Sequence, residues 1–316
     1  MPTKFKDVSK AEWLARVEKD LKGKPLAGLN FTVAGHTFTP FHHREDLAAL
    51  PVPVRQSAGW RIGQEFDCSD PAAANKAILR ALNRGVSEIH LSHRAPLTEA
   101  VLDTILDGVF RDIVEIVFVR EDYIHNGKQP EREQFFASNF YTEADEPSAL
   151  AWDLFRAYDD LLRSGPYVPV FHLFSKQDHF ATVAKLRAMR LCWHLITESH
   201  GEKADCKLCA HLLFDDAADD NTRMIAASPL TMAAITGGAD TVMISPANDE
   251  YDTAFAERIA TNIHHLLAYE SGFDKVADPA AGSYFLEKMT DHYAQKIWAG
   301  FQQNVKHPRP GSFQNP

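Results

Sequence analysis

Hydrophobic positions along this chain alternate between short apolar runs and helical periods. After Gly59, an apolar stretch at 60–66 precedes a helical pattern in which Ala74, Ile78 and Leu82 share one face. Such strand and helix pairs repeat about seven times, which is typical of parallel βαβ units. Strands are expected at 60–66, 86–91, 113–119, 134–141, 167–174, 206–214 and 241–245, and helices at 71–84, 97–107, 149–163, 179–197, 222–236 and 255–270.

Seven or eight units in about 240 residues favour an α/β fold of the (β/α)8 TIM-barrel type over an open sheet. The count is ambiguous around residues 120–140, and the sequence leaves open whether one unit is trimmed there. The run 113–119 is apolar enough to predict a strand buried on both faces. We therefore expect an N-terminal arm over 1–58, a barrel over 59–303 and a flexible, proline-rich tail over 304–316.

The arm begins with a predicted amphipathic helix over 9–23. Ser9 is a suitable N-cap with Glu12 three residues on, and Gly23 can end the helix in a left-handed turn. Its apolar face consists of Trp13, Leu14, Val17 and Leu21. This face either contacts a partner protein or docks on the chain's own barrel, and the sequence leaves both interpretations open.

Composition excludes several classes of protein. The 316 residues are 45% hydrophobic and carry a formal charge of −10, so the basic surface of a nucleic-acid-binding protein is missing. No apolar run reaches eighteen residues, and the first ten residues lack the apolar core of a signal peptide. Four scattered cysteines do not suggest a disulfide framework, so we expect a cytoplasmic protein.

Few residues suggest chemistry by spacing alone. Cys206 and Cys209 form a CxxC pair, but on a predicted strand they point to opposite faces and cannot bind one metal together. The acidic run at 215–220 is best interpreted as a helix cap. His211 shares a strand face with Cys209, and a satisfied core histidine is favoured over a functional one. No phosphate-binding glycine loop or nucleophile elbow occurs.

Several segments resemble the barrel of the adenosylcobalamin-dependent methylmalonyl-CoA mutase family. The segment 258–262 (RIATN), the segment 276–285 (VADPAAGSYF) and the later Trp298 and Phe301-Gln302 are similar to a block of that family nearly residue for residue. The helix at 180–193 and the opening EWLARVEKDLKGKPLAGL also resemble family segments, the latter an arm that reaches a partner subunit.

The resemblance implies that this chain does not bind the cofactor itself. In the family, a cobalamin-binding domain carries the motif D-x-H-x-x-G, whose histidine ligates cobalt, and this sequence contains no such motif. Adenosylcobalamin is therefore expected on a partner, with no cofactor and no metal in this chain.

The residues that act in catalytic family members are largely replaced. Gln64 matches the family, but Gly63 and Glu65 stand where catalytic chains have arginine and tyrosine. His211 also matches, whereas the stretch 138–144 offers no histidine that would bind the thioester carbonyl. Only thirteen residues separate Arg120 from Gln134, where the family has about fifty with its carboxylate-binding groups.

These losses predict no catalytic residues here, with Gln64 and His211 as remnants of a pocket. The resemblance implies a non-catalytic small subunit that stabilises a catalytic large subunit interconverting methylmalonyl-CoA and succinyl-CoA. The segment 237–246 is similar to the small subunits and points the same way. The alternative is an active acyl-CoA-binding barrel that borrows cobalamin from a separate subunit. A metal-dependent barrel hydrolase is disfavoured, since 60–66 contains no histidines.

Overall fold

A single parallel sheet of seven strands organises the chain. The computed structural model describes residues 8–33, 35–47, 54–55, 57–92, 97–118, 139–142, 147–176, 178–201, 204–214, 219–245 and 253–307, and of 139–142 it describes the backbone alone. The strands are β3 (Arg61–Asp67), β4 (Glu88–Ser92), β5 (Glu115–Phe118), β6 (Asn139–Thr142), β7 (Val170–Ser175), β8 (Lys207–Leu212) and β9 (Thr241–Ile244).

The strand order identifies a barrel that is open along one seam. The order is β5-β4-β3-β9-β8-β7-β6, so the first strand, β3, pairs in parallel with the last, β9. Other consecutive strands are neighbours except β5 and β6, which are the two edges of the sheet in the described part of the chain. This is the order of a TIM-type barrel with seven described strands. The predicted barrel-like α/β fold is confirmed.

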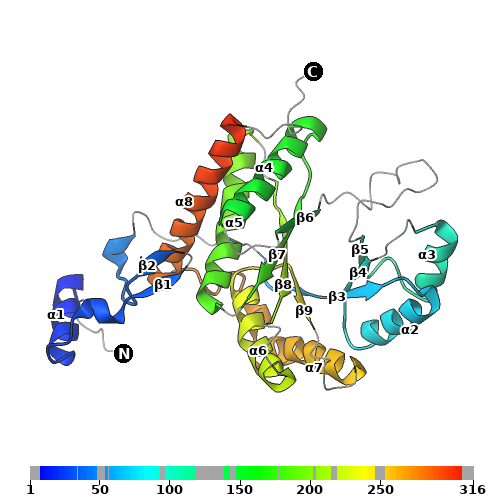
Figure 1. Ribbon diagram of the computed structural model, residues 1–316, viewed down its shortest axis with the longest axis horizontal. Coiled ribbons are helices and arrows are strands. Elements are labelled where there is room, and N and C mark those ends of the chain that lie inside the picture. Colours follow the sequence, from blue (N-terminus) through cyan, green and yellow to red (C-terminus); the bar gives the residue numbers. More distant parts are fainter. Residues whose placement is uncertain are drawn as a thin grey trace, which may run out of the picture.

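The helices cover the outside of the curled sheet (Figure 1). They are α2 (Pro71–Leu82), α3 (Glu99–Ile105), α4 (Pro147–Ser164), α5 (His179–Ser199), α6 (Asp220–Thr236), α7 (Thr253–His265) and α8 (Tyr284–Lys306). One apolar cluster fills the space between β3–β5 and α2–α3, and a larger one lies under α4, α5, α6 and α8. The sheet thus has an apolar outer face and a separate inner face.

Aspartate caps fix the starts of three of these helices. Asp70 accepts hydrogen bonds from the backbone N–H groups of Ala72 and Ala73, and Asp178 accepts one from Ala181. Asp219 accepts the N–H of Thr222, which confirms the cap interpretation for this member of the acidic run. Residues 215 and 216 lie outside the described residues.

Three expectations differ from the structure. The residues of β5 are only half-buried, because β5 is an edge of the described sheet and lacks a second neighbouring strand. The long helix α8 was not expected from periodicity, and it continues to Lys306, past the boundary expected at residue 303. After His265, the helix α7 continues as a π-helical turn over Leu266–Glu270, followed by a short 3₁₀ turn at Phe273–Lys275.

The N-terminal arm contains α1 (Lys10–Asp20), two 3₁₀ turns (Leu26–Leu29 and Arg44–Asp46) and a hairpin of β1 (Phe31–Val33) and β2 (His36–Phe38). Ser9 and Glu12 form the expected capping box. The hairpin packs on α8, since the Phe31 ring lies 5.7 Å from Phe285 and Phe38 lies 5.5 Å from His292. The arm is therefore anchored to the barrel by its hairpin.

Within the described residues, no helix combines the length and the apolar character needed to cross a lipid bilayer.

Candidate functional site in the barrel lumen

The inner face of the sheet encloses a space, here called the lumen, that polar side chains occupy. Alternation along the strands separates the two faces. On β8, Leu208, Ala210 and Leu212 belong to the large outer cluster, whereas Cys209 packs with Val170 and Met243 in a small inner one. The residues assigned to the lumen are Arg61, Gly63, Glu88, His90, Glu115, His172, Lys207, Cys209, His211, Thr241 and Met243.

A network of charges lies at the end of the lumen where the strands begin. Glu115 of β5 pairs with both Arg61 of β3 and Lys207 of β8. Arg61 also lies 4.0 Å from the Glu88 carboxylate, which accepts a 2.7 Å hydrogen bond from the Thr241 hydroxyl. The pairing of β5 with β8 spans the lumen, because three strands separate them in the sheet.

Next to this network, five side chains form what we call the lumen cluster: Glu88 and His90 from β4, His172 from β7, and Cys209 and His211 from β8. His172 Nδ1 lies 2.8 Å from His211 Nε2, and Cys209 Sγ lies 3.6 Å from the same nitrogen. His90 Nε2 lies 2.8 Å from Glu88 Oε1. The cluster brings together strands that are not neighbours in the sheet.

Burial sets the protonation of the cluster. It lowers the pKa of His172 well below 6.5 and, with the nearby His90, lowers the pKa of His211 to about 3. Burial also raises the pKa of the Cys209 thiol well above its usual value. For Glu88, burial raises the pKa, but hydrogen bonds from His90 and Thr241 outweigh it and hold the carboxyl pKa below its usual value. His172 and His211 are therefore neutral at pH 7.

Gly63 shows how tightly the lumen is filled. A β-carbon on Gly63 would lie 2.7 Å from Thr241 Cγ2 and 2.8 Å from Met243 Cγ, closer than real β-carbons come to other atoms. An arginine in the position implied by the family resemblance would need both neighbours to move. The close packing of β9 against Gly63 therefore leaves no room for an arginine at this position.

The structure does not bring the two predicted remnant residues together. His211 lies in the lumen cluster, where its ring stacks on Phe174 with centroids 4.7 Å apart. Gln64 instead donates a 3.2 Å hydrogen bond to Glu257 of α7, on the outer face of β3. Cys206, just before β8, lies in the outer cluster and Cys209 in the inner one, so the two cysteines are on opposite faces as expected.

Sequence reasoning did not single out His90, His172 and Glu88. Each lies at an ordinary position of a predicted strand, and only the curl of the sheet brings His90 to within 5.6 Å of His172 and 6.2 Å of His211 between ring centroids. The Cys209-x-His211 spacing was the one available signal, because residues two apart share a strand face.

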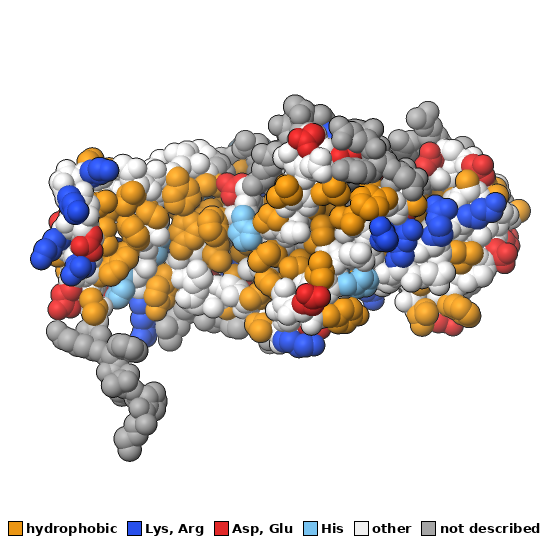
Figure 2. Space-filling view, turned by 90° about the horizontal axis from the view of Figure 1, so that it is seen from below, with side chains coloured by type: hydrophobic (Ala, Val, Ile, Leu, Met, Phe, Trp, Pro, Cys, Tyr) orange, Lys and Arg blue, Asp and Glu red, His pale blue; other side chains and the backbone are white. Residues whose placement is uncertain are grey.

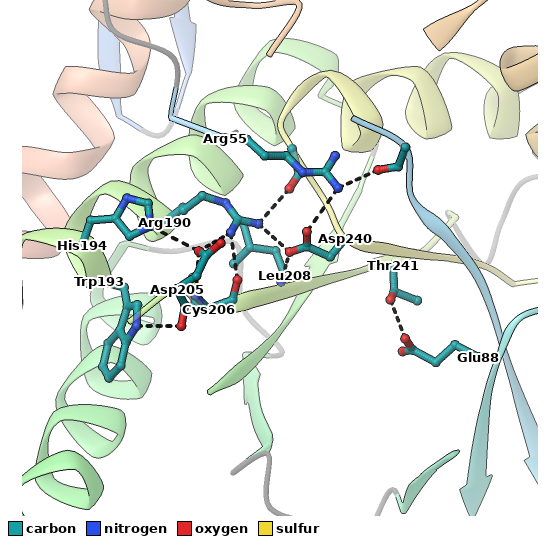
Figure 3. A network of polar contacts seen from close by, with 12 residues as sticks. Arg55, Glu88, Arg190, Trp193, His194, Asp205, Cys206, Leu208, Asp240 and Thr241 are labelled. Carbon is teal, nitrogen blue, oxygen red and sulfur yellow. Dashed lines mark hydrogen bonds and ion pairs between the residues drawn. The ribbon is translucent and has the colours of Figure 1, made fainter. Parts of the chain in front are cut away.

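An arginine network holds the strand that supplies two of the cluster residues (Figure 3). The guanidinium of Arg190, on α5, donates 2.6 Å to Asp205 and 2.8 Å to the Cys206 carbonyl, just before β8. It also binds Asp240, just before β9, which in turn pairs with Arg55 at 3.2 Å. Arg190 is 2% exposed, so the starts of β8 and β9 are joined beneath the barrel by a buried cation.

The predicted partner-contact residues lie on the arm. Trp13, Leu14, Val17 and Leu21 are all half-buried, and none of the residues of α1 is fully buried. The Trp13 ring packs edge-on against Phe41 at 4.8 Å, and Lys10 pairs with Asp46. The helix therefore rests on its own arm, at the end away from the barrel (Figure 1).

The comparisons with known proteins show which family this chain is similar to. The model of the methylmalonyl-CoA mutase family matches residues 169–307. The methylmalonyl-CoA mutase small subunit of Streptomyces virginiae is 26% identical over 96% of this chain and 64% of its own length. The chain is thus similar to the methylmalonyl-CoA mutases over residues 169–307, and along most of its length it is similar to their small subunits.

Other proteins show the same similarity. The small subunit of Porphyromonas gingivalis is 23% identical over 95% of this chain and 63% of its own length, and a probable small subunit of Mycobacterium tuberculosis is 35% identical over 42% of this chain and 23% of its own length. This chain thus spans less than two thirds of the length of these mutase subunits. Among solved structures, dihydropteroate synthase from Thermus thermophilus aligns with 67% of this chain and 95% of its own at a TM-score of 0.31 and 10% identity, too low to establish a shared fold.

Proposed function

We propose that this chain is the non-catalytic small subunit of an adenosylcobalamin-dependent methylmalonyl-CoA mutase. In this proposal it binds and stabilises a catalytic large subunit, which interconverts methylmalonyl-CoA and succinyl-CoA. Adenosylcobalamin is carried by that partner, and this chain contributes no residue to the chemistry.

The main support for the proposal is that side chains paired with one another fill the lumen. Carbon-skeleton rearrangement needs a dry cavity with donors aimed at a thioester oxygen and a clamp for a free carboxylate. In this lumen the Arg61–Glu115–Lys207 charges are paired with one another. One ring nitrogen of His90 is bonded to Glu88, and one ring nitrogen of His172 is bonded to His211. These groups support a packed scaffold rather than a substrate channel.

The exposed apolar surface supports binding to a partner. Hydrophobic side chains spread broadly over the arm and the middle of the molecule on the face seen from below (Figure 2). The half-buried side chains of α1, Trp13, Leu14, Val17 and Leu21, belong to the arm. An arm that extends away from the barrel and has an apolar helix face suits a subunit contact.

Two measurements test the proposal. The large mutase subunit from the same source is mixed with this chain at micromolar concentration and analysed by size exclusion, where we expect co-elution. Separately, calorimetric titration of this chain with methylmalonyl-CoA or succinyl-CoA is expected to give no heat of binding. Failure to co-elute would contradict the proposal. Binding heat from either acyl-CoA would instead support the alternative of an active barrel subunit that borrows cobalamin.

A further inference from the structure

The lumen cluster has the composition of a metal site rather than of an acid–base site. Its donors are three imidazoles, one thiol and one carboxylate, all of them buried. Two overlapping triads, His172–Cys209–His211 and Glu88–His90–Cys209, each have their donor atoms within 4.8 Å of one another. Nitrogen and sulfur donors select zinc and similar transition metals, whereas magnesium and calcium take oxygen donors.

We propose that the lumen cluster binds one transition-metal ion of the Zn²⁺ class. His172, Cys209 and His211 supply three ligands, and Nδ1 of His90 supplies the fourth. Glu88 does not bind the ion but orients His90. With four protein ligands and no open position, the site is structural rather than catalytic.

The distances agree with a shared tetrahedral ion. With Zn–S near 2.3 Å and Zn–N near 2.05 Å, a thiolate sulfur and an imidazole nitrogen on one tetrahedral ion lie about 3.5 Å apart. Cys209 Sγ and His211 Nε2 are 3.6 Å apart. Two imidazoles on such an ion place their centroids about 5 Å apart. The observed centroid distances are 5.1 Å for His172–His211, 5.6 Å for His90–His172 and 6.2 Å for His90–His211, so the His90 ring has to approach His211 by about 1 Å when the ion binds.

One contact has to open on binding. His172 Nδ1 and His211 Nε2 are 2.8 Å apart, which is the length of a hydrogen bond between a donor and an acceptor nitrogen. Two nitrogens on a tetrahedral zinc lie about 3.3 Å apart, so the rings separate by about half an ångström while the ion takes the place of the shared proton.

The orientation of His90 is the second, independent observation. Its Nε2 is bonded to Glu88, so His90 can donate that N–H to the carboxylate and carry a lone pair on Nδ1. The Nδ1 atom is buried and, among the described residues, has no hydrogen-bond partner. Metal-binding histidines commonly donate their other N–H to a carboxylate in this way. The Thr241 hydroxyl holds the second oxygen of Glu88 and fixes the pair.

A metal here would join the two sides of the open barrel. His90 belongs to β4, on the side of the sheet that ends at β5, and His172, Cys209 and His211 belong to β7 and β8, on the side that ends at β6. β5 and β6 are the edges of the described sheet and do not pair with each other. A cross-link between the two sides would compensate for the absence of that pairing.

The test uses the full chain, stripped of metal with a chelator and titrated with Co²⁺. We expect one Co²⁺ per chain, strong visible bands of a tetrahedral ion and a thiolate-to-cobalt charge-transfer band in the near ultraviolet, all displaced by Zn²⁺. Cys209→Ser is expected to abolish the charge-transfer band. The matched control is Cys206→Ser, because Cys206 is equally buried but lies on the outer face of the sheet, and it should keep the band. Glu88→Gln should weaken Co²⁺ binding about 10–100-fold.

Each outcome decides the question. Absence of a stoichiometric tetrahedral Co²⁺ spectrum in the unaltered chain would overturn the proposal, as would a charge-transfer band that survives in Cys209→Ser or disappears in a folded Cys206→Ser. If Cys209→Ser does not fold, X-ray absorption of the zinc-loaded unaltered chain replaces it. One sulfur and three nitrogens around the metal support the proposal, and a shell of oxygen alone rejects it.

Discussion

At the scale of single residues, Gly63 limits what the lumen can hold. Its missing side chain leaves space that Thr241 and Met243 of β9 already occupy. We expect Gly63→Ala to lower the free energy of unfolding by about 1–3 kcal/mol through overpacking. The matched control is Gly28→Ala, where no atom lies within 4 Å of the added β-carbon and φ is not positive. Urea unfolding followed by circular dichroism measures both, and equal midpoints for the two variants would contradict this account.

The protonation of His264 makes stability depend on pH. Its Nδ1 accepts a 3.0 Å hydrogen bond from the Trp60 indole, and burial lowers its pKa to about 3. Between about pH 6.5 and 3 the unfolded chain therefore binds a proton that the folded chain does not. The free energy of unfolding is expected to decrease as the pH is lowered through this window, by at most about 1.4 kcal/mol per pH unit from this residue.

Replacing the titrating group isolates this effect. His264→Gln keeps an acceptor for Trp60 but cannot be protonated, so its urea midpoint should fall less steeply with decreasing pH than that of the unaltered chain. His307→Gln, at an exposed position after α8, should leave the slope unchanged. Identical slopes in all three proteins would show that His264 does not contribute.

Part of the candidate site can be predicted from the sequence at this scale. The alternation of a strand is enough to place Cys209 and His211 on one face and Cys206 on the other. It cannot bring His90 to them, because that contact depends on how far the sheet curls across the intervening strands. Gln64 was a candidate by resemblance alone, and its side chain lies on the outer face with Glu257.

At the scale of elements, the Arg190 network joins α5 to the starts of β8 and β9. Arg190→Leu would remove the guanidinium that donates to the Cys206 and Gly238 carbonyls, and it would leave Asp240 with Arg55 as its remaining paired cation. Because breaking a buried pair typically costs about 3–5 kcal/mol and these carboxylates are partly exposed, we expect a loss near the lower bound. Urea unfolding measures it. Arg16→Leu, which breaks the exposed Arg16–Asp20 pair of α1, should cause no measurable change, and equal losses would refute a special role for Arg190.

Elements were predictable where local chemistry decides them. Ser9 and Asp70 cap their helices because short polar side chains satisfy the free N–H groups of the first turn. Burial of β5 was not predictable, since an apolar strand is buried on both faces only if it has neighbours on both sides. The helix α8 is not among the expected helices, since the residues around Trp298 and Phe301 enter the prediction only through their family resemblance.

At the scale of the whole molecule, the number of strand and helix units was enough to predict a barrel rather than an open sheet. The pairing of β3 with β9 is the contact that distinguishes the two, and it joins residues far apart in the chain. The packing of the arm was not predictable in the same way. Its hairpin docks on α8, whereas α1 rests on its own arm. Whether an arm element packs on the barrel or on the arm itself is decided by tertiary contacts, which the local sequence pattern does not reveal.

The apolar face of α1 provides the last prediction. If the arm contacts the large mutase subunit, Val17→Asp should weaken that complex at least tenfold, because a charge in an interface core loses its hydration without gaining a partner. The urea midpoint of this chain alone should change little, since Val17 is only half-buried. Glu18→Ala, at an exposed position of the same helix, is the control and should bind normally. Calorimetric titration of each variant with the large subunit measures the affinity, and unchanged binding by Val17→Asp would remove α1 from the interface.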